Sequence, residues 1–285
     1  MLESLRHFTL VAQHQTLTAA ARHAHVTQPA LTASIQRLEA QFGAKLLVRG
    51  PSGATLTAAG EALLPRARAA LAAVEEGRRA VAEVMGLAVG SVRIGAGATV
   101  CTYYLPRTLA KFRVRYPGVS ILVREASQPD LVDALEIGDL DLVILARIAP
   151  TTYGSRGVHR EKWQDDELVL AAAPGVDVKT APFVTFAHGA TTRDIVNRYF
   201  PTTPIAMELG SIAAVKANTR AGVGVALVSR RSAQRDFALG QLVEVPDERT
   251  PIIRPLDIVH RGRDRLSPSA AALLKMLREQ TRRTR

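Results

Sequence analysis

Residues 16–57 contain two helix starts so close together that only a short helix and a tight turn fit between them. The first start is Thr16, whose hydroxyl can cap a run of small helix-forming residues that is expected to end near His25. The second start is Thr27, which is followed by Pro29 in the first helical turn, where the missing proline N–H costs nothing. This spacing predicts two helices joined by a tight turn.

The second of these helices has an apolar side and a polar side. Leu31, Ile35 and Leu38 recur at helical spacing and can face a core. Polar residues occupy the other sides, where they are free to meet a DNA groove: Thr32, Gln36 and Arg37.

A two-stranded wing is expected after this helix, which closes at Phe42 and Gly43. Residues 45–49 and 54–57 have the composition of short strands, and a turn of Gly, Pro and Ser separates them. A short helix, a tight turn, a polar-faced second helix and a wing are typical of a winged helix-turn-helix, whose second helix enters the major groove of DNA. The sequence therefore predicts a DNA-binding domain over residues 1–58.

Side chains of the second helix are expected to reach base edges, and side chains nearer the wing to reach phosphates. The candidates for reading bases are Gln28, Thr32 and Gln36. The candidates for phosphates or the DNA rim are Arg37, Arg49 and Thr57. Thr18, Thr27 and Pro29 complete the set of candidate DNA-binding residues.

The charge of the chain supports a nucleic-acid partner only weakly. The 285 residues carry a net charge of +11, and a basic balance favours a polyanionic partner. Residues 1–58, however, hold five Lys and Arg against two Asp and Glu, which is a net charge of only +3. Much of the excess lies nearer the C-terminus, as at residues 230–231 and 282–283, where solvated surface is the simpler interpretation.

Cysteine content and hydropathy indicate where the protein works. A single cysteine excludes a disulfide within the chain and fits a reducing compartment. Glu3 and Arg6 interrupt the apolar residues at the N-terminus, so no signal peptide is predicted. No stretch approaches the roughly 18 apolar residues that a membrane span needs. We therefore expect a cytoplasmic protein with no membrane partner.

Residues 58–86 are expected to form one long helix of roughly 43 Å, at 1.5 Å per residue. Seven positions alternate by three and four residues, and six of them are apolar: Leu64, Ala67, Leu71, Val74, Arg78, Val81 and Met85. This is a coiled-coil pattern. Pairing with a second copy would cover the apolar seam, so residues 59–88 are predicted to form a linker and dimerisation helix. The alternative is an amphipathic helix that packs on its own domain.

The chain has an α/β pattern from residue 91 onward. A first block alternates strands and helices over residues 92–95, 104–116, 119–123, 129–137 and 140–145. A second block has strands at 168–172, 183–186, 205–208, 223–228 and 242–245, with helices at 192–199 and 211–221. Such alternation predicts right-handed crossovers and parallel sheets. A strand at 256–260 and a helix at 267–282 would return the chain to the first block.

Several motifs of this chain resemble those of the LysR-type transcriptional regulators. In the N-terminal part they are Ala19-Ala20, residues 26–32, residues 35–39 and residues 56–60. In the C-terminal part they are Phe112, residues 116–118, residues 138–141, residues 208–211 and residues 221–224. The chain departs from the family pattern at Ala33, at Leu47 and at the wing tip, residues 51–54.

The resemblance implies a sensing domain over residues 91–285 with the two-lobed fold of periplasmic binding proteins. Lobe I would cover about 91–163 plus 262–285, and lobe II about 164–261. The resemblance also implies the partners: double-stranded operator DNA, a small-molecule effector, further copies of the chain in a homodimer or homotetramer, and RNA polymerase. It implies no enzymatic activity and no cofactor.

Ligands in such folds bind at the carboxyl ends of strands, against helix N-termini. The first strand ends at residues 95–99, just before a helix, so Thr99, Cys101 and Thr102 offer hydroxyl, thiol and free N–H groups to a small anion. Residues that match Thr99 contact effectors in the family. Further effector-binding candidates are Arg147, His188, Thr191 and Ser211. Turn chemistry for the last three, and a surface arginine for Arg147, remain the alternatives.

Three features imitate enzyme sites. Residues 95–97 resemble the start of a dinucleotide fingerprint, but Val100 stands where the third glycine belongs. Cys101 has no partner cysteine and no adjacent histidine motif. No Cys or acidic cluster joins His23 and His25 as metal ligands.

We therefore predict an effector-responsive transcription regulator. The rival functions are a soluble small-molecule binding protein without regulatory DNA binding and, third, an α/β enzyme.

Overall fold

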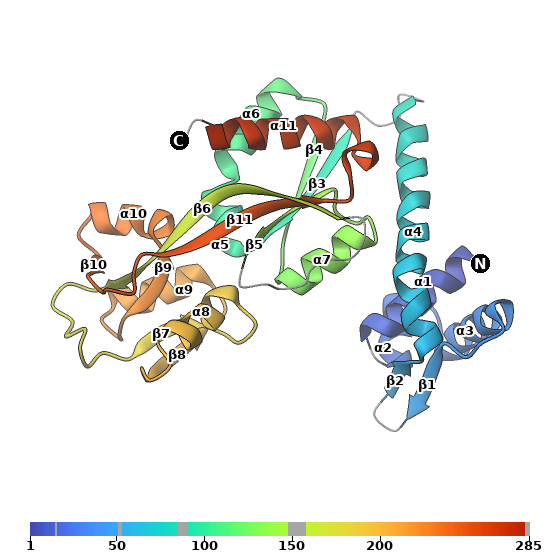
Figure 1. Cartoon of the computed structure of the whole chain (residues 1–285), viewed down its shortest axis with the longest axis horizontal. Helices are drawn as coiled ribbons and strands as arrows, with labels where there is room; N and C mark the ends of the chain where they lie inside the picture. Colours follow the sequence, from blue (N-terminus) through green and yellow to red (C-terminus); the bar gives the residue numbers. More distant parts are fainter. Residues whose placement is uncertain (15, 51–52, 85–89, 148–157, 283–285) are drawn as a thin grey trace. The chain divides into compact units, whose positions relative to one another are not determined.

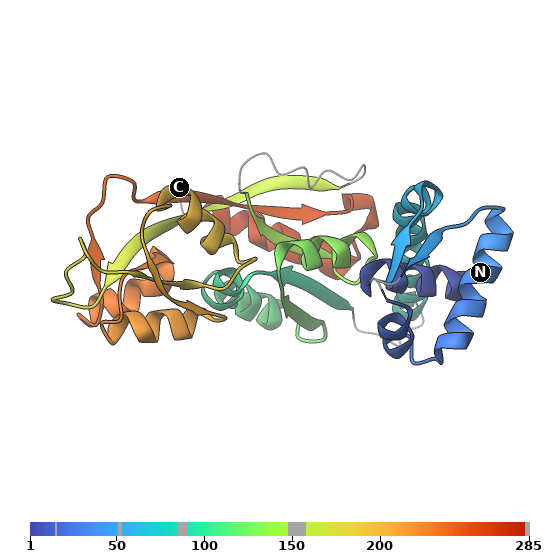
Figure 2. The same cartoon turned by 90° about the horizontal axis from the view of Figure 1, so that it is seen from below.

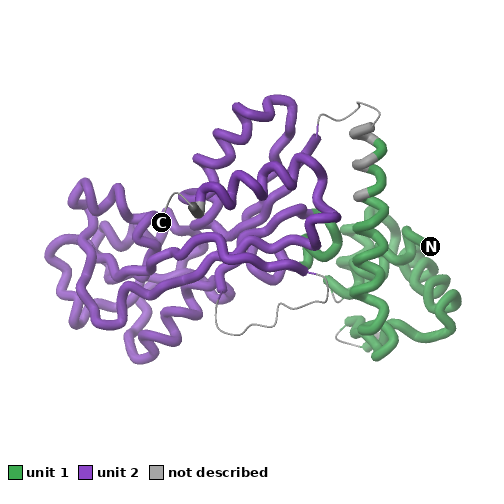
Figure 3. The backbone as a smooth tube through the Cα atoms, turned by 45° about the horizontal axis from the view of Figure 1, so that its top comes forward, with its two compact units in different colours: residues 1–88, 133–139 green, residues 89–132, 140–285 purple. Residues whose placement is uncertain are grey.

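The computed structural model describes residues 1–14, 16–50, 53–84, 90–147 and 158–282. The chain divides into two compact units (Figure 3). The first unit comprises residues 1–88 with 133–139, and the second comprises residues 89–132 with 140–285. No helix in the described part of the chain is long and apolar enough to cross a membrane.

The first unit contains a small helical domain, a two-stranded wing and a long helix (Figure 1). Its elements are α1 (Leu2–His14), α2 (Leu17–His23), α3 (Gln28–Phe42), β1 (Leu47–Gly50), β2 (Gly53–Leu56) and α4 (Ala58–Val84). The Thr16 hydroxyl accepts from the Ala19 N–H at 3.2 Å, and the Thr27 hydroxyl accepts from the Ala30 N–H at 3.4 Å. Gly43 ends α3 in the left-handed conformation, with φ of 64°. The predicted helix starts and stop are therefore confirmed.

The core of this domain also contains a helix that the sequence reading did not identify. Phe8 of α1 is fully buried, and α1 packs against α2, α3 and α4. Leu31, Ile35 and Leu38 of α3 join it, each no more than 1% exposed. Burial of this apolar side fixes which side of α3 remains accessible.

The long helix α4 buries part of its predicted seam within its own domain. Ala67 is 1% exposed, and Leu64 and Leu71 pack beside it against the domain core. Farther along, Val81 is 59% exposed. The alternative of packing on its own domain thus applies to the first half of the helix. Met85 and residues 86–88 lie outside the described residues.

The second unit contains one large mixed sheet and one small sheet. Its strands are β3 (Ser91–Ala96), β4 (Ser120–Glu125), β5 (Leu142–Ala146), β6 (His159–Ala172), β7 (Phe183–Phe186), β8 (Ile205–Leu209), β9 (Ala226–Ser229), β10 (Val243–Val245) and β11 (Ile252–His260). The order in the seven-stranded sheet is β10-β6-β11-β5-β3-β4, with β9 also paired to β6. The strands β7 and β8 form a separate parallel pair.

Helices cover these sheets: α5 (Ala98–Tyr103), α6 (Pro106–Arg115), α7 (Gln128–Glu136), α8 (Thr191–Tyr199), α9 (Ile212–Arg220), α10 (Arg230–Ala238) and α11 (Pro268–Arg282), with a short 3-10 turn at Arg263–Arg265. The strands β3, β4 and β5 run parallel, as predicted. The strands β9, β10 and β11 instead run antiparallel to β6. In the second block the expected parallel pairing is therefore confirmed for β7 and β8 and wrong for β9 and β10, which pair antiparallel with β6.

Hydrophobic clusters define two lobes, and the long strands β6 and β11 contribute residues to both lobes. Trp163 of β6 is buried in the first core with Val92 and Leu273, whereas Leu168 and Leu170 of the same strand lie in the second core with Phe183. Figure 2 shows β6 and β11 side by side along the unit, in agreement with their antiparallel register. The lobes are thus connected by a shared pair of strands.

Candidate nucleic-acid interface and ligand cavity

The accessible side of α3 carries the residues that were predicted to read bases. Gln28, Gln36 and Arg37 are exposed and Thr32 is partly exposed. The Thr18 hydroxyl donates to the Gln28 side-chain oxygen at 3.2 Å, so α2 helps to hold the first of these amides. The side chain of Arg49 lies outside the described part of the chain.

Three candidate DNA-binding residues have structural contacts of their own. The Thr27 hydroxyl caps α3, and Pro29 lies in the first turn of that helix. The Thr57 hydroxyl donates to the Lys45 carbonyl at 2.7 Å and accepts from the Gly60 N–H at 3.0 Å, which caps α4. These residues shape the helix starts, whereas the amides of Gln28 and Gln36 are exposed on α3.

Glu39 anchors the wing to α3, a role that the sequence reading did not assign. One carboxylate oxygen of Glu39 accepts from the Leu46 N–H at 2.9 Å and from the Leu47 N–H at 3.4 Å. The other oxygen accepts from the Lys45 ammonium at 2.8 Å. Burial alone would raise the pKa of Glu39, but these three hydrogen bonds outweigh burial and lower its pKa. An ionised Glu39 therefore fixes where the wing begins.

A cavity of about 370 Å³ lies between the two lobes of the second unit. The first lobe contributes the carboxyl end of β3 and the start of α7, and the second lobe contributes the loop before α8 and the start of α9. Three of the predicted effector-binding residues line this cavity: Thr99, His188 and Thr191.

The other four predicted residues are not among the described residues that line the cavity. Thr102 is exposed elsewhere on α5. The Cys101 thiol contacts the Ala96 carbonyl oxygen at 3.4 Å, and burial followed by the charge of Glu125 raises its pKa to about 11. The structure thus places a protonated, packed thiol beside the cavity and gives it no contact with the cavity itself.

Arg147 and Ser211 each have a partner that the sequence could not identify. The Arg147 guanidinium forms two hydrogen bonds to the buried Asp257 carboxylate, at 2.6 and 2.9 Å. The Ser211 hydroxyl accepts from the Ala214 N–H at 3.2 Å and caps α9. Both side chains therefore hold local structure, because their polar atoms are engaged away from the cavity.

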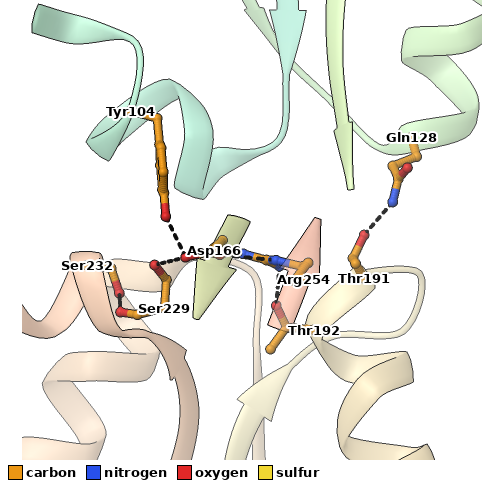
Figure 4. A network of polar contacts seen from close by, with 8 residues as sticks. All are labelled: Tyr104, Gln128, Asp166, Thr191, Thr192, Ser229, Ser232 and Arg254. Carbon is orange, nitrogen blue, oxygen red and sulfur yellow. Dashed lines mark hydrogen bonds and ion pairs between the residues drawn. The ribbon is translucent and has the colours of Figure 1, made fainter. Parts of the chain in front are cut away.

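Residues that the sequence reading missed supply much of the polar lining. The Gln128 amide donates to the Thr191 hydroxyl at 2.8 Å and bridges the two lobes (Figure 4). Thr192 and Arg254 also line the cavity, and the Arg254 Nη1 atom donates to the Thr192 hydroxyl at 3.1 Å. A threonine pair at the start of a helix was visible in the sequence, but the partners of these residues were not.

A buried polar network connects the cavity to the shared strands (Figure 4). Asp166 of β6 is fully buried and forms an ion pair with Arg254 of β11. The same carboxylate accepts from the Tyr104 hydroxyl at 2.7 Å and from the Ser229 hydroxyl at 2.6 Å. Burial and the charge of Asp166 raise the pKa of Tyr104, so its hydroxyl stays a donor.

Two protein families match this chain, and together they cover almost all of it. Residues 2–61 match "Bacterial regulatory helix-turn-helix protein, lysR family". Residues 85–282 match "LysR substrate binding domain". The first match covers the helix-turn-helix and the wing, and the second covers the unit that holds the cavity.

Curated relatives are similar over nearly their whole length. The RuBisCO operon transcriptional regulator of Allochromatium vinosum is 29% identical over 286 residues, covering 95% of this chain and 93% of the relative. The HTH-type transcriptional regulator CbbR of Rhodospirillum rubrum is 29% identical, covering 99% and 97%. The probable RuBisCO transcriptional regulator of Porphyra purpurea is 30% identical, covering 90% and 87%.

Solved structures share the fold. The crystal structure of ArgP from Mycobacterium tuberculosis is 21% identical, with a TM-score of 0.66 over 98% of this chain and 96% of that protein. Full-length CbnR in complex with its target DNA is 23% identical, with a TM-score of 0.60 over the whole of both chains. The chain belongs to the LysR family and is a transcriptional regulator, with a helix-turn-helix DNA-binding domain and an effector-binding domain, rather than an enzyme.

Proposed function

We propose that this regulator works in the cytoplasm, binds operator DNA through the exposed side of α3, and responds to a small anionic molecule in the cavity between its lobes. The observation that carries the proposal is the cavity of about 370 Å³, which is lined from both lobes of a chain that also has a helix-turn-helix. A molecule that contacts both lobes can change the angle between them only if it binds one arrangement better than the other.

We assign a separate function to each part of the chain. Residues 1–58 bind DNA, residues 59–88 link and pair two chains, and residues 91–285 sense the effector with a lobe I of about 91–163 plus 262–285 and a lobe II of about 164–261. Gln28, Thr32 and Gln36 read base edges, and Arg37 and Arg49 contact phosphates. Thr99, His188 and Thr191 contact the effector. Exposed apolar surface near the end of α4, at Val81, supports pairing of two chains there.

A gel shift with the full chain tests the proposed function. The DNA upstream of the chain's own gene is compared with a random duplex of equal length, and a RuBisCO operon promoter is added because the curated relatives carry that name. We expect preferential retention of one natural DNA over the random duplex. Ligand-dependent melting without any DNA preference would instead favour the rival function, a small-molecule binding protein without regulatory DNA binding.

A further inference from the structure

Arg254 and Asp166 lie opposite one another on the two strands that connect the lobes. They are direct partners in the β6–β11 register, and their side chains are 6% and 0% exposed. The Arg254 Nε and Nη2 atoms both donate to one oxygen of Asp166, so the side edge of the guanidinium faces the carboxylate (Figure 4). This geometry holds the guanidinium plane in one orientation.

The Asp166 carboxylate has no capacity left for another donor of comparable geometry. Its second oxygen accepts from Tyr104 of the first lobe and from Ser229 at the end of β9 in the second lobe. Each oxygen therefore accepts two hydrogen bonds, which matches the four lone-pair sites of an ionised carboxylate. A buried ion pair of this kind contributes little net stability, but it fixes geometry when every bond is satisfied.

Arg254 lines the cavity and keeps donors that have no acceptor among the described residues. A guanidinium has five N–H groups; Asp166 and Thr192 occupy three of them. Among the described residues that line the cavity, Arg254 is the only lysine or arginine, and Glu125 at an exposed position is the only acid. The cavity thus offers one guanidinium, and the negative charge of the Asp166 carboxylate balances the positive charge of that guanidinium.

We propose that Arg254 recognises one acidic group of the cavity ligand, through carboxylate or phosphate oxygens, and that Asp166 is the positioning residue that orients Arg254. This inference rests on the proposed function, because it names the chemistry of the same cavity. The Arg254–Asp166 pair is neutral as a whole, and no second lysine or arginine lies in the described lining. The cavity therefore selects ligands with a single acidic group over ligands with several.

The test uses the full chain and four small probes at matched ionic strength: lactate and dimethyl phosphate with one acidic group, citrate with three, and glycerol with none. Thermal melting at increasing probe concentration gives the half-saturating concentration of each. We expect lactate or dimethyl phosphate to stabilise the protein more than citrate and glycerol do. The two one-acid probes show whether carboxylate or phosphate is preferred. The proposal is overturned if neither one-acid probe stabilises the protein at about 50 mM, a concentration at which even a weakly binding fragment would occupy its site.

Substitutions separate recognition from folding. Arg254→Lys keeps a positive charge but loses the planar fork, and we expect the half-saturating concentration of the preferred probe to rise about tenfold or more. Arg107→Lys, at an exposed position of α6, is the matched control and leaves that concentration unchanged. If Arg254→Lys does not fold, the double variant Asp166→Asn with Arg254→Gln, in which both side chains are uncharged, replaces it. Unchanged probe binding in the folded variant overturns the proposal.

Asp166 has a signature that a purely structural role would not produce. Asp166→Asn removes the balancing charge and leaves the guanidinium with a net charge of +1, so discrimination against citrate should shrink or reverse. Retained discrimination contradicts the positioning role. Operator binding by the wild-type chain is measured in parallel. Failure of that binding counts against the proposed function, whereas normal operator binding with unaltered probe selectivity in Arg254→Lys counts against this inference alone.

Discussion

Removing the Glu39 carboxylate should loosen the wing of the DNA-binding domain. Glu39→Ala leaves the N–H groups of Leu46 and Leu47 without their acceptor. Leu46 is 1% exposed and Leu47 is 7% exposed, so water cannot readily replace the carboxylate. The substitution also removes the ion pair with Lys45, whose side chain is 76% exposed.

The size of the effect can be estimated from these contacts. An unsatisfied buried N–H costs about 1–3 kcal/mol, whereas an exposed ion pair contributes at most about 1 kcal/mol. We expect Glu39→Ala to destabilise the N-terminal domain by roughly 2–6 kcal/mol, mostly through the two backbone groups. Lys45→Ala removes only the exposed ion pair and serves as the matched control, with an expected loss below about 1 kcal/mol.

Hydrogen exchange reports this contact directly. The Leu46 and Leu47 amides should exchange much faster in Glu39→Ala than in the wild type, and operator affinity should fall because β1 starts at Leu47. Glu39→Gln keeps an acceptor oxygen, so its amide exchange rates should lie between those of the wild type and those of Glu39→Ala. If the two amides stay protected in Glu39→Ala, or if Lys45→Ala has the larger effect, the assignment of Glu39 as the wing anchor is wrong.

The same carboxylate gives the domain an acid dependence. Because the pKa of Glu39 is lowered in the folded state from its ordinary value of 4.5, its stabilising contribution is complete above that value. The contribution is lost as the pH falls from 4.5 through the lower folded pKa. Wild-type melting temperature should therefore drop over this range by more than that of Glu39→Gln, which cannot titrate there.

Three further substitutions test the remaining proposals. Gln28→Ala should lower the preference for operator over random DNA by about 1–3 kcal/mol in competition gel shifts, and an equal loss on both DNAs would show that Gln28 reads no base. Thr99→Val should raise the half-maximal effector concentration about tenfold, because a ligand oxygen loses its partner; an unchanged value removes Thr99 from the site. Val81→Asp should weaken self-association in sedimentation experiments, whereas the exposed control Val178→Asp should not; equal behaviour of the two would reject pairing through α4.

Local signals made the helical part of the DNA-binding domain predictable. The cap at Thr27 and the stop at Gly43 act within a few residues of the helix end that they define. The first helix was missed because the residues before Thr16 show no comparable start signal. The strand β6 was expected from Leu168 but begins at His159, since its first half is polar and only Trp163 marks the face that meets the first core.

The sequence predicts only those residues of the candidate site that lie in loops directly after a strand. Thr99, His188 and Thr191 follow strand ends, so the fold rule for ligand crevices identifies them. Arg254 and Asp166 are 88 positions apart, and only the antiparallel register of β6 and β11 brings them together. Arg147 was predicted to bind the effector, but it instead bonds to Asp257, which is 110 positions away and lies outside the described lining of the cavity. Pairings over such separations depend on topology, which spacing along the chain does not reveal.

The late position of β11 affects how the sensing domain forms on the ribosome. β11 pairs with β5 and β6 in the middle of the large sheet, and Leu273 of α11 completes the first core. Until β11 emerges, the edge of β5 lacks its neighbour, and an unpaired edge is open to pairing with other chains. At about 5–20 residues per second, the stretch from Ala146 to His260 takes roughly 6–23 seconds to synthesise. The nascent sensing domain should therefore depend on chaperones during that interval, whereas the N-terminal domain, whose core is complete by Leu71, can fold earlier.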